Sequence, residues 1–183
     1  MHSESCGLHV PGKALAFDIP QEILAKMGED HPMVKAMKMD PKEMDFKDAV
    51  DYAHDMLGDM NHGMQRWIDW NLIVDRTGGP RHVPGGFAAP LVYEEGGDFS
   101  RTPSYEYIKL IANTLQPGGV RIGCSVYGRD VEAAAVKNTD GSIGVVILNQ
   151  TEKDIAVNLR VDGRLTEIPV SGSALCAVRL TEI

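Results

Sequence analysis

The last third of the chain alternates apolar and polar residues at every second position. Ile155, Val157 and Leu159 are apolar, and the residues between them are small or polar. Because successive side chains of a strand point to opposite faces, this period of two predicts half-buried strands. The pattern recurs in six segments that we expect to be strands: residues 122–127, 131–138, 143–150, 155–161, 165–170 and 174–181. Their short spacing is typical of a β-sandwich, with hairpin turns at Asp140-Gly141 and Asp162-Gly163.

Upstream of these segments the pattern changes to strand, loop and helix. Residues 67–75 form an apolar run with two tryptophans and two carboxylates, and Gly78-Gly79-Pro80 follows. The run predicts a buried strand that opens into a turn. A helix is expected to begin at Thr102-Pro103 and to end at Pro117-Gly118-Gly119. Such a unit fits the last repeat of an α/β barrel, in which the loop of residues 76–101 lies on the catalytic face.

A second helix is expected earlier in the chain. Residues 45–67 carry apolar side chains at steps of three and four, which predicts an amphipathic helix with Asp45 as its N-cap. A shorter helix is expected over residues 20–27. His54 and His62 do not have the four-residue spacing of a helical metal site. We therefore expect solvated or capping histidines and no metal ion.

Several short segments, taken in order, resemble one family of enzymes. Residues 67–75 resemble the last barrel strand of glycoside hydrolase family 30, the glucosylceramidase-like retaining β-glycosidases. The other segments are residues 1–6, similar to the Ser-Glu-x-Cys stretch that carries the family's nucleophile, residues 77–83 in the loop after the final strand, residues 118–123 between barrel and sandwich, and residues 140–151 in the C-terminal β-domain. One such match is weak evidence, but their shared order makes the resemblance specific.

The resemblance implies an α/β plus all-β chain, in which the last two βα units of a TIM-type (β/α)8 barrel precede a C-terminal antiparallel β-sandwich. A whole barrel of this kind needs about 250 residues, whereas the chain has 183. We expect residues 1–118 to be the C-terminal remnant of the barrel, with strands 7 and 8 and their helices, and residues 119–183 to be the β-sandwich domain. The family's acid/base glutamate lies in an Asn-Glu pair, and the sequence contains no such pair.

The resemblance also implies a set of site residues. Glu4 corresponds to the catalytic nucleophile, and Trp70 to an aromatic residue that stacks on the sugar, with Trp67, Asp69 and Asn71 as substrate-binding neighbours. The residues by themselves leave other interpretations open, because a glutamate near a terminus is usually solvated and large aromatics mostly pack in cores. Strand geometry predicts that Trp70 points opposite to Asp69 and Asn71.

Two functions from different classes follow. The first is the C-terminal portion of a retaining β-glycosidase that hydrolyses O-glycosidic bonds of β-glucosides or glycolipids, inactive alone because the acid/base half is missing. The second is a non-catalytic β-sandwich module for carbohydrate binding or assembly. We expect a carbohydrate or glycolipid substrate and no cofactor. We also expect self-association, or pairing with a missing N-terminal half, because two βα units leave a strand edge and an apolar helix stripe uncovered.

Composition and net charge limit the classes of binding partner and the cellular locations that we expect for the chain. A net charge of -8 argues against nucleic acid and anionic membrane surfaces, whose binders need a basic face. No segment approaches the roughly 18 apolar residues of a membrane span, and the N-terminus has no signal-peptide pattern, so a cytoplasmic location is the default, although the parent enzyme could be secreted. Cys6, Cys124 and Cys176 suit neither a disulfide framework nor a zinc site, so we expect reduced thiols. Asn149-Gln150-Thr151 matches the N-glycosylation acceptor pattern, which matters only in a secreted eukaryotic protein.

Overall fold

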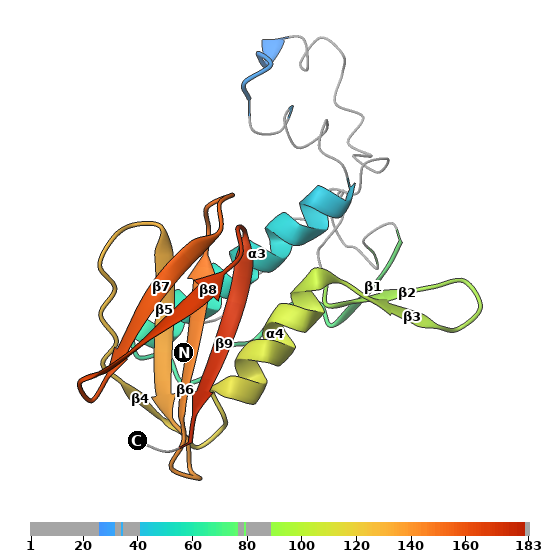
Figure 1. The fold of residues 1–183 in the computed structure, drawn as a ribbon. Helices are drawn as coiled ribbons and strands as arrows, with labels where there is room; N and C mark the ends of the chain where they lie inside the picture. Colours follow the sequence, from blue (N-terminus) through green and yellow to red (C-terminus); the bar gives the residue numbers. More distant parts are fainter. Residues whose placement is uncertain (1–25, 32–33, 35–40, 77–78, 80–88, 182–183) are drawn as a thin grey trace. The chain divides into compact units, whose positions relative to one another are not determined.

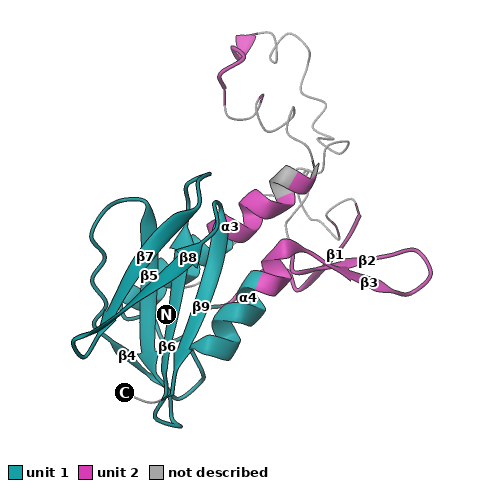
Figure 2. Cartoon of the chain, viewed as in Figure 1, with its two compact units in different colours: residues 1–2, 52–67, 107–183 teal, residues 3–51, 68–106 magenta. Residues whose placement is uncertain are grey.

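The computed structural model describes residues 26–31, 34, 41–76, 79 and 89–181 (Figure 1). The chain forms two compact units, and the boundary between them passes through helices α3 (Pro41–Asn61) and α4 (Pro103–Thr114) (Figure 2). Among the described residues, unit 1 contains 52–67 and 107–181, and unit 2 contains the remainder.

Unit 1 contains two antiparallel sheets (Figure 1). Their strands are β4 Val120–Ile122, β5 Val131–Lys137, β6 Ile143–Asn149, β7 Ile155–Val161, β8 Arg164–Val170 and β9 Ala174–Leu180. The strand order is β4-β5-β6-β9 in the larger sheet and β7-β8 in the smaller one. One buried cluster takes alternate residues from β5, β6 and β8: Ala133, Ala135, Val145, Ile147, Ile168 and Val170. Because both sheets contribute to this core, they form the β-sandwich that the period of two predicts.

Five of the six expected strands, β5 to β9, are confirmed. The first expectation, residues 122–127, is wrong, since β4 ends at Ile122 after pairing with the last residues of β5. Gly123 follows, and glycine weakens the interior of a strand. Further along, Tyr127 is 99% exposed and has no packing surface. Both expected turns are confirmed, with Gly141 and Gly163 at positive φ.

Helix α3 begins and ends earlier than the apolar spacing predicts. It covers Pro41–Asn61, so Asp45 lies inside the helix and is not its N-cap. Proline suits the first helical position, where its missing N–H would be unpaired anyway. At the other end Gly63 has a φ of 87°, and the amides of Gly63 and Met64 donate to carbonyls of the last turn. This Schellman motif ends the helix, although apolar residues continue to Trp67 at helical spacing.

The apolar face of α3 is buried, and polar contacts attach the helix to β5 within unit 1. The buried side chains are Ala49, Tyr52, Ala53, Met56 and Leu57. Asn61 Nδ2 donates to the carbonyl of Ala133 at 2.8 Å. His54 Nδ1 lies 2.7 Å from Glu132 Oε1. Of the shorter helix expected over residues 20–27, only Lys26, which is helical, and the following residue are described.

Unit 2 contains a small sheet of three short strands, β1 Ile73–Asp75, β2 Leu91–Tyr93 and β3 Phe99–Arg101. Strand β1 runs parallel to β2, and β2 is antiparallel to β3. The strand expected over residues 67–75 is therefore shorter than predicted, because β2 pairs only with its last three residues and Asp69 makes a single bridge. The hairpin inside residues 76–101 is not expected from the sequence, since strands this short show no periodicity. Helix α4 begins at Pro103, as predicted.

Candidate functional site

The site residues expected from the sequence are only partly described. Glu4 lies outside the described residues, so its role as the nucleophile stays a prediction. Trp67 belongs to unit 1, whereas Asp69, Trp70 and Asn71 belong to unit 2. These three consecutive residues lie just before β1.

Trp67 packs against helix α3. Its ring meets Tyr52 edge to face, with ring centroids 5.5 Å apart and an interplanar angle of 62°. The indole Nε1 is buried and has no hydrogen-bond partner among the described residues. An edge-to-face pair of this kind stabilises a core contact beyond the area that it buries. The packing supports the core interpretation of Trp67, and its role in substrate binding stays a prediction.

Trp70 has the exposed aromatic ring that stacking on a sugar requires. Its side chain is 45% exposed, whereas Asp69 and Asn71 on either side are less exposed. Asp69 Oδ1 accepts a hydrogen bond from the Trp70 backbone amide at 2.8 Å, which holds the carboxylate beside its own backbone. The peptide bond between Trp70 and Asn71 is cis. An indole open to solvent can offer its apolar face to the C–H side of a sugar ring.

Asn71 carries a buried amide nitrogen without a partner. Its Nδ2 atom is inaccessible to solvent and makes no hydrogen bond with the described residues. Most buried polar groups are paired, so this orphan donor is an unusual feature of the segment before β1. Among the expected subsite residues, Trp70 therefore has an exposed ring, whereas Trp67 and Asn71 each have a buried donor without a partner in the described part of the chain.

The loop after β1 and the hairpin after it are held by polar contacts that the sequence did not indicate. The amide of Asp75 donates to the carbonyl of Gly79 at 2.7 Å, and the amide of Gly79 donates to Asp75 Oδ1 at 3.0 Å. Glu94 receives a hydrogen bond of 2.7 Å from the Ser100 hydroxyl and pairs with Arg76. The Ser100 hydrogen bond holds the pKa of Glu94 below its usual range, and Arg76 adds to this effect against desolvation.

One face of the β2–β3 hairpin is aromatic. Tyr93 and Phe99 face each other across the strands, edge to face at 5.7 Å, and both rings are exposed. The Arg101 guanidinium lies 4.7 Å from the ring centroid of Tyr105, a cation–π contact. This face adds exposed apolar surface to unit 2.

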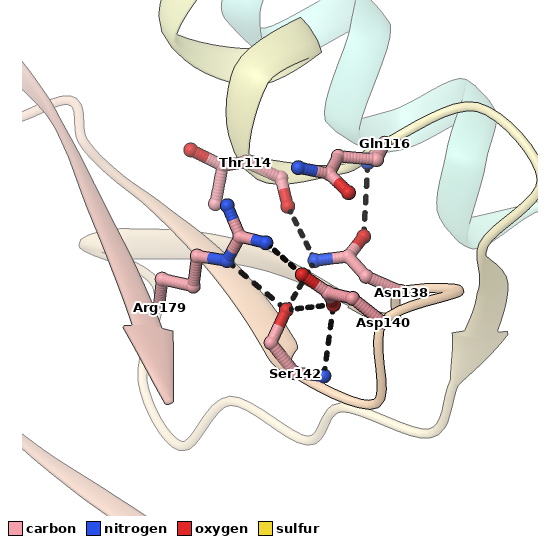
Figure 3. A network of polar contacts seen from close by, with 6 residues as sticks. All are labelled: Thr114, Gln116, Asn138, Asp140, Ser142 and Arg179. Atoms are coloured by element: carbon pink, nitrogen blue, oxygen red, sulfur yellow. Dashed lines mark hydrogen bonds and ion pairs between the residues drawn. The ribbon is translucent and has the colours of Figure 1, made fainter. Parts of the chain in front are cut away.

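A second polar network lies in unit 1, where α4 ends beside the β5–β6 turn (Figure 3). Asn138 Nδ2 donates to the carbonyl of Thr114 at 3.1 Å, and its Oδ1 accepts from the amide of Gln116 at 3.0 Å. The remaining members of the network are Asp140, Ser142 and Arg179, which form hydrogen bonds with one another. The Ser142 hydroxyl and then its amide hold the pKa of Asp140 below its usual range, and Arg179 adds to the effect against desolvation. The network uses its polar groups internally, so it anchors the helix end and leaves little binding capacity for a ligand.

Two described histidines and the two described cysteines have structural or solvent-exposed positions. His62 Nδ1 donates to the Gly58 carbonyl at 2.7 Å, which is the capping role expected of it, and the His54 side chain is largely exposed. In the described residues no group of three or more His, Cys, Asp or Glu side chains is arranged to hold a metal ion. Cys124 and Cys176 form no disulfide, and burial raises the pKa of both thiols.

No described helix combines the length and apolar character needed to cross a membrane.

Two sequence models of one family match the chain. The model described as the TIM-barrel domain of glycosyl hydrolase family 30 matches residues 29–112. The model described as the beta sandwich domain of the same family matches residues 118–175. The two matches together cover most of the chain, and they follow each other in the order that the fold shows.

Known proteins with similar sequences support the same family. "Putative glucosylceramidase 1" of Caenorhabditis elegans is 36% identical over 124 residues, which are 63% of this chain and 24% of that protein. Lysosomal acid glucosylceramidase of Mus musculus is 25% identical over 113 residues, 61% of this chain and 22% of that protein. The chain thus spans about a quarter of the length of these relatives.

The crystal structure of SrfJ from Salmonella typhimurium has the same fold, with a TM-score of 0.71 at 23% identity over 76% of this chain and 32% of that one. The chain belongs to glycoside hydrolase family 30, and it contains the C-terminal part of the family's TIM-type barrel followed by the family's β-sandwich domain.

Proposed function

We propose that the chain is part of a retaining β-glycosidase that hydrolyses O-glycosidic bonds of β-glucosides or of glycolipids such as glucosylceramide. The observation that carries the proposal is the exposed ring of Trp70, in a segment that the family's barrel model matches. The names of the relatives support a glucosylceramidase-like substrate.

In this proposal Glu4 attacks the anomeric carbon and the aglycone oxygen leaves with a proton from a second carboxylic acid. Retaining enzymes hold the two carboxyl groups about 5 to 5.5 Å apart. The sequence has no Asn-Glu pair to supply the acid. The isolated chain is therefore proposed to be inactive, and activity requires the other barrel strands from another polypeptide or segment.

A partner is also proposed for unit 2. Three large apolar side chains in β1 or just before it are exposed, namely Ile68, Leu72 and Ile73. Exposed apolar groups that lie together commonly mark a protein interface. Self-association, or pairing with the N-terminal half of a family 30 barrel, would cover them.

Catalysis is tested with an aryl β-glucoside and a mechanism-based epoxide. The chain alone is expected to show no turnover and no adduct on Glu4 by mass spectrometry. Co-expression with the N-terminal barrel strands of a relative is expected to restore both, and Glu4→Gln to remove both again. Turnover that survives Glu4→Gln in the co-expressed sample would contradict the assignment of the nucleophile.

Sugar binding is tested separately, because it does not need the second carboxyl group. We expect Trp70→Ala to abolish the binding of a β-glucoside measured by calorimetry. Leu72→Ala is the matched control, since Leu72 is exposed in the same segment. Equal loss in both variants would indicate damage to unit 2 and not a stacking contact.

The alternative function is a non-catalytic β-sandwich module. It is favoured by one observation, namely that the buried cluster of the sandwich consists of residues of unit 1 alone. A core of this kind can support a binding or assembly role without catalysis. If β-glucoside binding persists in Trp70→Ala, the binding surface lies elsewhere and this alternative is preferred.

A further inference from the structure

The acceptor asparagine of the Asn149-Gln150-Thr151 motif is completely buried. Asn149 is the last residue of β6, and its exposed fraction is 0%. N-glycosylation normally modifies asparagines in surface loops. Here the motif lies at the end of a core strand, although its sequence is that of an acceptor.

Every hydrogen-bonding group of the Asn149 side chain is in use. Nδ2 donates to the carbonyls of Lys153 at 2.8 Å and Ser171 at 2.9 Å. Oδ1 accepts from the amide of Thr151 at 3.0 Å and from its hydroxyl at 2.8 Å. An asparagine amide has two donor hydrogens, and both are committed to backbone carbonyls. The Thr151 hydroxyl, which completes the acceptor motif, is used in the hydrogen bond to Asn149 Oδ1.

These bonds close the junction between two connections of the sandwich. Residues 150–154 link β6 to β7, and residues 171–173 link β8 to β9. The amide of Ser173 donates to the carbonyl of Thr151 at 2.6 Å, and the amide of Gly172 donates to Asp154 Oδ1 at 2.9 Å. A Cβ added to Gly172 would lie 2.3 Å from the Glu152 carbonyl oxygen. The two connections are therefore in direct backbone contact around Asn149.

We propose that glycosylation of Asn149 and folding of the β-sandwich exclude each other. The transfer joins Asn149 Nδ2 to the anomeric carbon of a lipid-linked oligosaccharide. The bond from that carbon to the diphosphate oxygen breaks, the lipid diphosphate leaves with the bonding electrons, and the amide loses one proton.

The glycosylated Asn149 amide keeps one hydrogen on Nδ2, whereas the folded sandwich needs two for the hydrogen bonds to Lys153 and Ser171. Its sugar also needs a path to solvent that the packed connections of residues 150–154 and 171–173 do not provide. The acceptor motif is thus available only on the unfolded chain, and a chain modified there cannot close the junction around Asn149.

The test expresses the full chain behind a signal peptide in eukaryotic cells and separates monomer from aggregate. A second acceptor is introduced by Asp162→Asn with Arg164→Thr, at the exposed turn between β7 and β8. Asp162 already has a φ of 46°, a conformation that asparagine tolerates well. This variant keeps Asn149-Gln150-Thr151, so both acceptors are compared in one molecule by mass spectrometry of the released peptides.

We expect the monomer to carry glycan at position 162 and none at Asn149, with any glycan on Asn149 confined to the aggregate. A monomer that carries glycan on Asn149 and retains amide-exchange protection in β7 and β8 would overturn the proposal. A second measurement uses unmodified chain from bacteria. The Nδ2 hydrogens of Asn149 should exchange about tenfold or more slowly than those of Asn158, which is exposed on β7. Equal exchange rates would contradict the buried, fully bonded amide.

Discussion

Units 1 and 2 differ in the size of the buried apolar core that each contains. In unit 1, Ala134, Val146 and Leu148 are completely buried, and the polar groups of Asn138 and Asn149 are bonded to backbone within the same unit. In the described part of unit 2 the buried apolar side chains are Ala49, Val74 and Ala89, whereas Leu72 and Phe99 are more than half exposed. A β-sandwich closes its core with its own two sheets, whereas a barrel strand is covered only when the neighbouring strands and helices are present. The comparison supports the proposal that unit 2 is covered by a partner.

The two units also share one arrangement of polar side chains, in which a serine and an arginine bind a carboxylate. In unit 1 a serine hydroxyl and an arginine hold the Asp140 carboxylate, and in unit 2 Ser100 and Arg76 hold Glu94 in the same way. Each set stabilises a hairpin. The difference between the units therefore lies in their buried apolar cores and not in how their turns are held.

The strongest test of the comparison is a pair of truncations. Ile147→Ala removes a side chain from the buried cluster and is expected to lower the free energy of unfolding by about 3–4 kcal/mol. In the monomeric chain, Leu72→Ala in unit 2 is expected to change it by less than about 0.5 kcal/mol, because the side chain is exposed there. Urea unfolding of both variants gives the two values. A large loss in Leu72→Ala would mean that unit 2 is covered in solution.

A second test concerns the contact between strand β6 and the end of α4. A Cβ at Gly144 would lie 2.1 Å from the Thr114 carbonyl oxygen, so Gly144→Ala is expected to cost roughly 3 kcal/mol. Gly58→Ala is the control, since a Cβ there meets nothing within 4 Å. Because Gly58 lies inside α3, that substitution should stabilise the helix by about 0.5–1 kcal/mol. Thermal unfolding measures both, and similar midpoints for the two variants would rule out the close contact.

A third test removes the cap of α4. Asn138→Ala leaves the Thr114 carbonyl and the Gln116 amide without their partner, at a cost of roughly 2 kcal/mol. Asn158→Ala, on the exposed face of β7, should be close to neutral. Amide exchange should show the loss first at the C-terminal end of α4. A uniform loss over the sandwich would indicate a different role for Asn138.

The smallest expected effect is the pH dependence of the two carboxylate sets. The folded-state pKa of Asp140 is lowered by the Ser142 hydrogen bonds, so the resulting stabilisation is complete above the unfolded pKa and is lost as the pH falls through the folded one. The stability difference between the protein and Asp140→Asn should therefore shrink below about pH 4. Glu94→Gln should behave likewise in unit 2, because the pKa of Glu94 is lowered as well. A difference that grows on acidification would reverse the sign and refute both assignments.

The sandwich was predictable because its signals are local. The alternation from Ile155 onward repeats along the chain, and each Asp-Gly pair defines a turn without help from distant residues. The end of α3 was predicted wrongly for a related reason. Apolar side chains continue at helical spacing beyond Gly63. That glycine adopts a positive φ and ends the helix, so the spacing alone predicts a helix that is too long. Strands β2 and β3 were not predicted, since three residues show no period and their pairing is a tertiary property.

The candidate site was predictable only through resemblance. Trp70 and Asn71 were named because they match a family motif, and the structure adds an exposed ring and an unpartnered amide. The contacts of Arg76, Glu94 and Ser100 could not be read from the sequence, because they exist only once the hairpin has formed. The role of Glu4 stays a prediction.

The network at the end of α4 has a practical consequence for protein engineering. Two turns of the sandwich contain the same Asp-Gly pair, yet they differ in their freedom to change. At Asp140-Gly141 the neighbouring side chains anchor a helix, so an inserted epitope or tag would separate α4 from the β5–β6 hairpin. The Asp162-Gly163 turn is exposed on both residues, and its strands β7 and β8 pair along their whole length without it. An insertion library should therefore retain folded clones at the second turn and lose them at the first.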